Sequence, residues 1–261
     1  GLDYKDVSKR GEGSELTYDC NLSQHEYGKA HDGKPKLDKN TSSKIQDVDI
    51  LIIGGGAAGL STALGAWEAG ARDVLIVDRE ARPGGILKQC IHSGFGLDRF
   101  KEELTGPEYA QRDIDAIAQT GVKLWHDSTV IDLSCDKSDS RFHIVTVVTE
   151  DKGVIQVRAK AVCLAMGSRE RTRGAIGVAG TRPAGLYTAG AAQAFMNLKG
   201  QLPGKEIIIS GSGDIGLIMA RRLALQGANV KAVLARSAFA GGLHRNIVQC
   251  LEDFDIPILY S

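Results

Sequence analysis

The fold of this chain follows from residues 48–60, VDILIIGGGAAGL. An apolar run typical of a buried parallel strand leads into glycines with the spacing G-x-G-x-x-G, and a helix-like segment comes next. The first glycine of such a motif allows a tight turn, the second lets a phosphate approach the backbone, and the third lets helix and strand pack closely. Free N–H groups at the helix N-terminus then bind the anion. We therefore predict a dinucleotide-binding loop that comprises Gly54, Gly56, Ala57, Ala58 and Gly59.

A carboxylate follows the next predicted strand, as a dinucleotide site requires. Residues 73–77 read as this strand, and Asp78 stands 24 residues after Gly54. An acid at this place binds a ribose hydroxyl. We include its neighbour Arg79 in the predicted site. A glycine motif alone is often an accidental turn, but the order of strand, motif, helix and acid favours a nucleotide site.

A second copy of the motif, GSGDIG, occupies residues 211–216. A strand is predicted before it at 207–210, and a helix after it from Asp214 to Gln226. The predicted binding residues are Gly211, Gly213, Asp214, Ile215 and Gly216. The place of the ribose-binding acid is taken by Ala235, with Arg236 beside it. A missing acid with an adjacent guanidinium favours a 2′-phosphate, and hence NADP over NAD; the alternative is that Arg236 is a solvated loop residue.

Between the two motifs the pattern continues to alternate. A helix is predicted from Thr105 to Thr120, and a β-meander follows at 128–133, 142–149 and 154–158. A strand at 161–165 and a helix at 188–198 lead to the second motif. We therefore predict an α/β fold with two Rossmann-like dinucleotide-binding units, the first carrying the meander as an insertion. The predicted domains are a polar tail or linker at 1–47, a first nucleotide domain at 48–200 and a partial second one at 201–261.

Composition excludes several classes of protein. The 32 basic and 32 acidic residues cancel, so neither nucleic acid nor an anionic membrane is indicated as a partner. No apolar run approaches the roughly 20 residues of a membrane-spanning helix. The five cysteines are scattered and form no C-x-x-C pair, which argues against a disulfide framework, a zinc site and a local redox disulfide. A cytoplasmic location is the natural expectation. The first residue is Gly1, so we expect a processed, tagged or partial chain.

Several longer strings resemble a known family. They are GGILKQCIH at 84–92, GFG at 94–96, EELTGPEY at 102–109 and GSRERTRG at 167–174, together with the second glycine motif. With these strings the chain resembles NAD(P)/FAD-dependent oxidoreductases of the pyridine nucleotide-disulfide oxidoreductase superfamily. The likeness is greatest to the flavoproteins that accompany anaerobic glycerol-3-phosphate dehydrogenase. The FAD subunits of opine, proline and sarcosine dehydrogenases or oxidases are related.

This resemblance implies FAD in the first unit and NAD(P)H in the second. Gly84 and Gly85 would begin a segment along the flavin, Val130 would lie near the adenine, and Ala165 and Gly167 would belong to a turn beside FAD. Members of the superfamily continue past the point where this sequence stops and re-enter the FAD domain. We therefore expect a C-terminally incomplete chain whose FAD site is completed by a partner subunit, or a fragment that binds FAD weakly.

Two side chains beside the expected flavin are candidates for chemistry. Cys90 could interact with the ring as a thiolate, although we favour a small buried apolar role. His92 could exchange a proton near neutral pH, or it could be a hydrogen-bonded structural residue. The leading function is hydride exchange between NAD(P)H and FAD, with electrons passed to or from a small-molecule substrate. The alternatives are the FAD subunit of an amino-acid or opine dehydrogenase, and a non-catalytic half-site subunit.

Overall fold

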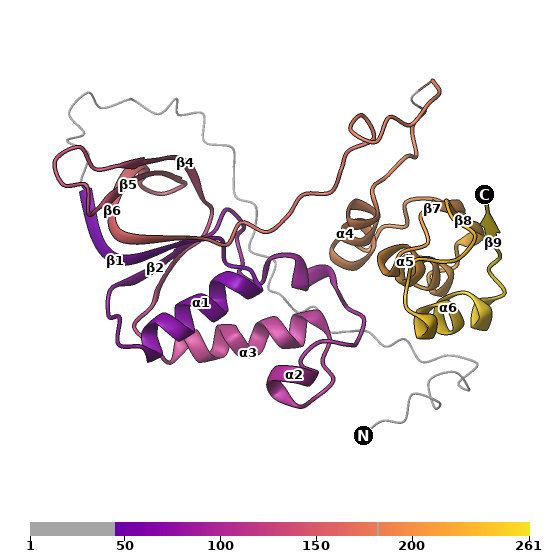
Figure 1. Ribbon diagram of the computed structural model, residues 1–261, viewed down its shortest axis with the longest axis horizontal. Helices are drawn as coiled ribbons and strands as arrows, with labels where there is room; N and C mark the ends of the chain where they lie inside the picture. Colours follow the sequence, from indigo (N-terminus) through magenta and orange to yellow (C-terminus); the bar gives the residue numbers. More distant parts are fainter. Residues whose placement is uncertain (1–44, 182) are drawn as a thin grey trace, which may run out of the picture. The chain divides into compact units, whose positions relative to one another are not determined.

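The computed structural model describes residues 45–181 and 183–261, which build two β-sheets with helices packed against them (Figure 1). The first sheet has the strand order β3-β2-β1-β6-β5-β4. Its strands are β1 (Ile45–Ile53), β2 (Val74–Val77), β3 (Lys123–Trp125), β4 (Ser128–Cys135), β5 (His143–Thr149) and β6 (Gly153–Leu164). Strands β3, β2, β1 and β6 are parallel, whereas β4, β5 and β6 pair antiparallel. The parallel part has the order of a Rossmann half.

Strand β6 is a single strand where two strands were predicted. The sequence analysis separated a meander strand at 154–158 from a parallel strand at 161–165, but the structure contains one continuous strand. Its first half pairs with β5, and from Gln156 onward it also pairs with β1. No glycine or proline interrupts residues 154–164, so the backbone has no reason to leave the extended conformation. The same pairing extends β1 back to Ile45, ahead of the predicted start at Val48.

Helices cover one face of the first sheet. Figure 1 shows α1 (Ala57–Glu68) and α3 (Gly106–Ala118) side by side there. Leu60 and Ala63 of α1 and Ile117 of α3 pack against buried residues of β1 and β2. The opposite face is buried by valines of the meander, among them Val145 and Val147. Two short helices, η2 (Gly85–Gln89) and α2 (Leu97–Phe100), lie between β2 and α3 in the chain.

A capping box explains where α3 begins. The Thr105 hydroxyl accepts a hydrogen bond from the Glu108 backbone N–H, and the Glu108 carboxylate accepts one from the Thr105 N–H at 2.8 Å. These two bonds satisfy backbone donors that a helix start leaves open. Hydrogen bonds from the Thr105 N–H and from the Thr105 hydroxyl to the Glu108 carboxylate lower the pKa of that carboxyl. The predicted helix from 105 to 120 is confirmed with its ends shortened.

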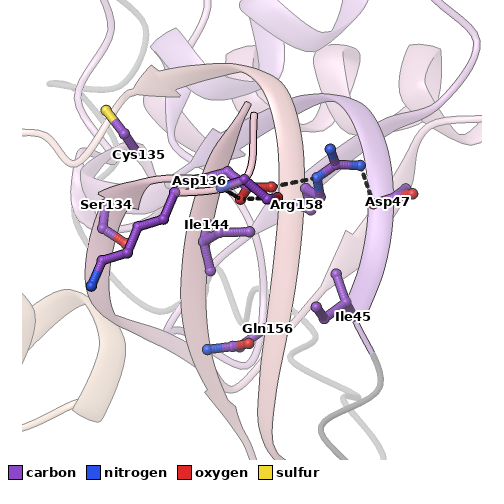
Figure 2. Close-up of a pocket in the computed structure, with 10 residues that line it drawn as sticks. Ile45, Asp47, Ser134, Cys135, Asp136, Ile144, Gln156 and Arg158 are labelled. Atoms are coloured by element: carbon purple, nitrogen blue, oxygen red, sulfur yellow. Dashed lines mark hydrogen bonds and ion pairs between the residues drawn. The ribbon is translucent and has the colours of Figure 1, made fainter. Parts of the chain in front are cut away.

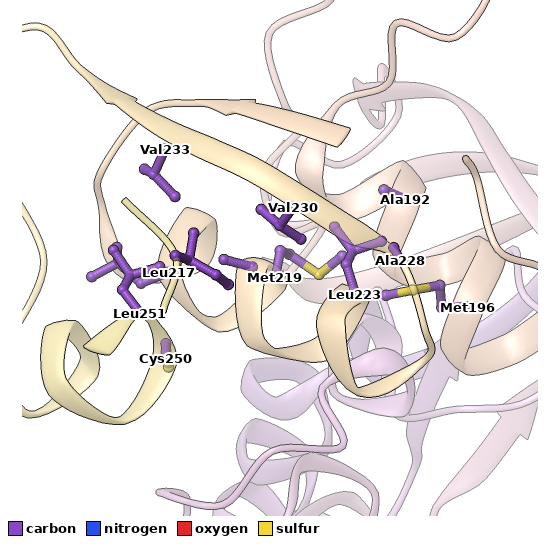
Figure 3. Close-up of a cluster of buried hydrophobic side chains, with 12 residues drawn as sticks. Ala192, Met196, Leu217, Met219, Leu223, Ala228, Val230, Val233, Cys250 and Leu251 are labelled. Atoms are coloured by element: carbon purple, nitrogen blue, oxygen red, sulfur yellow. The ribbon is translucent and has the colours of Figure 1, made fainter. Parts of the chain in front are cut away.

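The second sheet is parallel and smaller. It contains β7 (Glu206–Ser210), β8 (Asn229–Ala235) and β9 (Ile258–Tyr260) in that order. The helices of this part are α4 (Ala189–Lys199), α5 (Asp214–Leu225) and α6 (His244–Cys250), followed by the short η3 (Glu252–Phe254). Figure 3 shows their shared core, in which Met196 of α4 and Leu223 of α5 join Val230 of β8. The mixed α/β fold with Rossmann-like parallel sheets is therefore as predicted.

The predicted domain boundaries at 47 and 200 stay predictions. The expected polar tail falls outside the described residues except for Ile45, Gln46 and Asp47, which belong to β1.

Candidate functional site

The first glycine motif forms a tight turn between β1 and α1. Gly54 has φ of +109°, a conformation open to glycine, and a Cβ there would overlap the Ala165 carbonyl oxygen. A Cβ on Gly59 would overlap the Gly54 carbonyl oxygen. The Gly54 N–H donates to Val77 O at 2.8 Å, and the Ala165 N–H donates to Ile53 O at 2.8 Å. The turn is therefore enclosed by backbone on both sides, and only glycine fits at these two positions.

Asp78 holds this turn from the end of β2. Its side chain is 5% exposed. One carboxylate oxygen accepts the Gly55 N–H at 2.6 Å, and the other accepts the Glu80 N–H at 2.8 Å. A carboxylate oxygen has two lone pairs, so each retains one acceptor position beyond these bonds. Asp78 was predicted to bind a ribose, and the pattern of residues gave no indication that its carboxylate orders the loop.

The N-terminus of α1 is the anion-binding end of this loop. Gly56 is the N-cap, no side chain caps the helix, and the first turn contains no acidic residue. Gly84 and Gly85 lie against the motif: the Gly84 N–H donates to Gly55 O at 2.7 Å, and a Cβ on Gly85 would be 3.0 Å from the Gly56 Cα. The structure thus brings together most of the predicted first-site residues, which are Gly54, Gly56, Ala57, Ala58, Gly59, Asp78, Gly84, Gly85 and Ala165.

Three predicted residues stand apart from this turn. The Arg79 side chain is exposed and lies 3.7 Å from the Glu80 carboxylate. Val130 is half-buried on β4, whose first residue, Ser128, donates its N–H to Asp78 O at 2.9 Å. Gly167 is exposed with φ of +68° in the segment after β6. Their contacts with a cofactor stay predictions.

The second motif repeats the turn with a different set of acceptors. Gly213 caps α5, and a Cβ on Gly216 would overlap the Gly211 carbonyl oxygen. Asp214 is the acid here: one carboxylate oxygen accepts the Leu243 N–H and the Asn246 amide, both at 2.7 Å. The segment before α6 also donates to the motif, because Gly242 N–H bonds Ser212 O at 2.9 Å. A carboxylate therefore holds each glycine motif, at the strand end in one and at the helix start in the other.

The other residues predicted for the second site, Ile215 and Arg236, are at the surface. Ile215, on the first turn of α5, is 61% exposed. Arg236 has an exposed side chain, and its carbonyl accepts the Ser261 hydroxyl at 2.7 Å. Ala235, which precedes it, ends β8 and is buried.

The two motifs fit a dinucleotide to different degrees. The first offers an uncapped helix start with no nearby acid in its first turn, which suits a pyrophosphate. The second offers the same glycine turn, but the Asp214 carboxylate is in the first turn of α5. One of its oxygens accepts hydrogen bonds from the Leu243 N–H before α6 and from the Asn246 amide in α6, so part of its charge is directed to those donors. The first motif is therefore the better fit to a dinucleotide.

Cys90 and His92 occupy different environments. Cys90 follows η2, and burial raises the pKa of its thiol, so the thiolate is disfavoured at neutral pH. Its Sγ lies 3.9 Å from the Gln193 Oε1. The His92 Nδ1 lies 2.9 Å from Ser93 O, and the ring packs on Phe95 with centroids 5.1 Å apart. These contacts agree with an apolar packing role for Cys90 and with a hydrogen-bonded structural role for His92. The catalytic roles of both residues stay predictions.

A cavity of about 690 Å³ lies away from both motifs, at the meander. Figure 2 shows Arg158 between Asp136 and Asp47 at its wall. The Arg158 guanidinium donates to Asp136 at 2.7 Å and stacks on Phe142 at 3.8 Å. Hydrogen bonds from Ser138 and then from Arg158 lower the pKa of Asp136 to about 2. Because Arg158 and the two carboxylates pair with one another, this wall of the cavity stabilises the sheet. No pattern in the sequence predicted this group of paired charges.

Metal ligation and membrane insertion find no support in the part of the chain that the structure describes. Among those residues, no group of three or more His, Cys, Asp or Glu side chains is arranged to hold a metal ion. Within the same residues, no helix has the length and hydrophobicity that crossing a bilayer requires.

Comparison with known proteins points to the same kind of site. A family model described as pyridine nucleotide-disulphide oxidoreductase matches residues 48–254. An opine oxidase subunit of Agrobacterium tumefaciens (strain Ach5) is 32% identical over 208 residues, which are 78% of this chain and 40% of that protein. The alpha subunit of sarcosine oxidase from Rhizobium meliloti (strain 1021) is 26% identical over 207 residues, 78% of this chain and 20% of that protein. The chain thus spans less than half of these curated relatives.

Among solved structures, thioredoxin reductase from T. acidophilum has a similar fold. The TM-score is 0.62 at 22% identity, and the match covers 82% of this chain and 64% of that one. At this identity the likeness concerns the fold alone.

Proposed function

The chain belongs to the pyridine nucleotide-disulphide oxidoreductase family, and we propose that it forms the FAD- and nicotinamide-binding part of an oxidoreductase. The observation that carries this proposal is the first glycine turn. Its helix start has no capping side chain and no acid in the first turn, and Asp78 holds its loop in place. Bound together, a flavin and a nicotinamide supply hydride transfer, and the protein supplies their orientation.

In this proposal the residues of the chain have distinct tasks. The N–H groups at the start of α1 bind the FAD pyrophosphate, and Asp78 accepts a ribose hydroxyl through its remaining lone pairs. Gly84 and Gly85 allow η2 to pass close to the motif. The start of α5 binds the pyrophosphate of NAD(P)H. Cys90 stays a half-buried neutral thiol, and no side-chain acid or base is assigned to the hydride step.

NADPH is the nicotinamide that we propose. Ala235 offers no carboxylate to a 2′-hydroxyl, and the exposed Arg236 next to it can bind a 2′-phosphate. Localisation in the cytoplasm stays a prediction.

A second candidate is supported by the similarity to the opine oxidase subunit. In it, the chain is the FAD subunit of an enzyme that oxidises an amino acid or an opine, and a small-molecule substrate reduces the flavin. Both curated relatives are subunits by name, which favours a partner chain that completes the FAD site. A non-catalytic half-site role would have the same need for a partner. The likeness to the glycerol-3-phosphate dehydrogenase flavoprotein stays a prediction.

The visible absorption spectrum of the purified chain with FAD, recorded without oxygen, separates these candidates. Bleaching of a bound flavin by NADPH, faster than by NADH, is the expected result. A bound flavin that dithionite reduces but neither nucleotide reduces would favour the opine-type candidate. If the chain retains no flavin until a second subunit is added, the half-site role is the better description.

A further inference from the structure

Helix α4 is joined to the end of η2 by a buried pair of glutamines. Gln89 and Gln193 are 8% and 7% exposed and lie 104 residues apart in the sequence. The Gln89 Nε2 donates to the Gln193 Oε1 at 3.0 Å and to the Gly190 carbonyl at 3.1 Å. Buried amides cost free energy unless they are hydrogen-bonded, so each side chain depends on the other.

The Asn197 side chain extends this contact from the backbone of Gln89 to α5. The Asn197 amide, one turn further along α4, donates to the Gln89 carbonyl at 2.7 Å. Its own oxygen accepts a hydrogen bond from the Arg222 Nε of α5 at 3.0 Å. We call Gln89, Gln193, Asn197 and Arg222 the glutamine junction. It links the end of η2, through α4, to the last turn of α5.

A separate bond holds the start of α4. The Glu170 carboxylate, from the segment after β6, accepts the Gly190 N–H at 2.7 Å. The Thr188 hydroxyl caps the same helix by accepting the Ala191 N–H. Helix α4 is therefore tied at its beginning and along its length to segments that precede it by many residues.

The glutamine junction connects two elements, η2 and α5, that begin at the two glycine motifs. η2 begins at Gly85, beside Gly56 of the first motif, and ends at Gln89 in the junction. α5 begins at the second motif and reaches the junction at Arg222. Apolar surfaces slide past one another at little cost, whereas hydrogen bonds weaken steeply when the donor and acceptor are misaligned. A polar contact here defines the register between α4 and η2.

We propose that Gln193 and Asn197 are positioning residues, which hold η2 from α4 and thereby set the geometry in which a nicotinamide bound at α5 meets a flavin beside η2. This inference rests on the proposed nicotinamide-linked function. Neither residue needs to touch a cofactor. They act on the alignment of the flavin and the nicotinamide. Misplacement of reacting groups by about 1 Å costs up to roughly 100-fold in rate.

The test is stopped-flow reduction of the FAD-loaded chain by NADPH, with Gln193→Leu as the principal variant. We expect the limiting rate of flavin reduction to fall about tenfold or more. The NADPH concentration at half-maximal rate and the affinity for FAD should stay within about twofold of the original protein. The double variant Gln89→Leu, Gln193→Leu removes both amides, leaves no unpaired partner between them, and should show the same slow reduction in a stable protein. Gln111→Leu is the matched control, because Gln111 is an exposed residue of α3 that bonds only Asp115 in the described structure.

Hydrogen exchange of the same proteins without nucleotide provides the second readout. Peptides that cover residues 85–90 should exchange faster in Gln193→Leu than in the original protein and in Gln111→Leu. Unchanged exchange there, or reduction at the original rate in both junction variants, would overturn the inference.

Failure of the proposed function gives a different pattern. If NADPH does not reduce the flavin of the original protein, the nicotinamide-linked function is wrong, and the hydrogen-exchange comparison alone decides whether the junction positions η2.

Discussion

The two glycine motifs have the same backbone turn and differ in where their acid stands. In the first, Asp78 at the end of β2 accepts the Gly55 N–H, and the start of α1 has no acid. In the second, the end of β8 is Ala235, and Asp214 at the start of α5 accepts two donors from the segment around α6. The turn is therefore set by glycines, whereas the charge around it is set by residues that the glycine spacing does not constrain.

This difference predicts different ligands for the two turns. The first has no acid in the first turn of its helix, so the free N–H groups of the helix start attract an anion. The second already has a carboxylate in that place and lacks the acid that would prefer a free 2′-hydroxyl. Substitutions at five positions test the contrast, beginning with the one expected to cost most.

Gly59→Ala should have the largest effect, because the added methyl group would overlap the Gly54 carbonyl oxygen. We expect a loss of about 3 kcal/mol in the free energy of unfolding, measured by urea titration, together with loss of FAD. Gly65→Ala on the same helix is the control, since its added Cβ would meet no atom within 4 Å apart from the adjoining backbone of its own helix. That variant should gain up to about 1 kcal/mol. Gly59→Ala with unchanged stability would mean that the turn is not as close as described.

Asp78→Ala comes next, because it leaves the buried Gly55 N–H without its acceptor. The expected loss in the free energy of unfolding is about 2 kcal/mol, and FAD affinity should fall with it. Asp115→Ala, which removes an exposed carboxylate from α3, should change stability by less than about 0.5 kcal/mol. Equal effects of the two substitutions would contradict a holding role for Asp78.

Ala235→Asp gives the second motif the acid that the first possesses. We expect the preference for NADPH over NADH to fall about tenfold, since one charged hydrogen bond contributes about 1.4 kcal/mol or more. Nucleotide affinities from fluorescence titration measure this ratio. Arg236→Ala should lower NADPH affinity without raising that for NADH, and an unchanged ratio in both variants would argue against a 2′-phosphate site here.

Asp214→Ala should cost less stability than Gly59→Ala or Asp78→Ala, about 1 kcal/mol, since the donors that it releases are partly exposed and can bond water. Hydrogen exchange should rise in peptides that cover residues 241–247 and stay constant at residues 54–60. Removal of this carboxylate should also strengthen nucleotide binding at α5 slightly. Weaker binding in the variant would indicate that Asp214 itself contacts the ligand.

Local patterns were enough to predict much of the fold. The helix at α3 was predicted from Thr105 and the proline that follows it, and the structure adds the capping box that explains it. The parallel strands on each side of both glycine motifs were predicted from apolar runs of the right length. The continuity of β6 was missed because a single strand that pairs with different neighbours along its length leaves no mark in local composition.

For the candidate site, the sequence predicted which residues to consider but not the contacts that they make. Spacing alone identified Asp78 and both glycine loops, but the partners of the Asp78 carboxylate depend on the backbone that surrounds it. Likewise, Gln89 and Gln193 have no sequence pattern that would join them across 104 residues.

The sequence by itself determined the order of strand, turn and helix at both glycine motifs and the absence of an acid at residue 235, because these depend on residue type and short-range spacing. Only the tertiary structure decided which acid holds which turn, the protonated state that burial favours for Cys90, and the glutamine junction. These features depend on distances between residues far apart in the chain, and such distances exist only after the sheets and helices have packed.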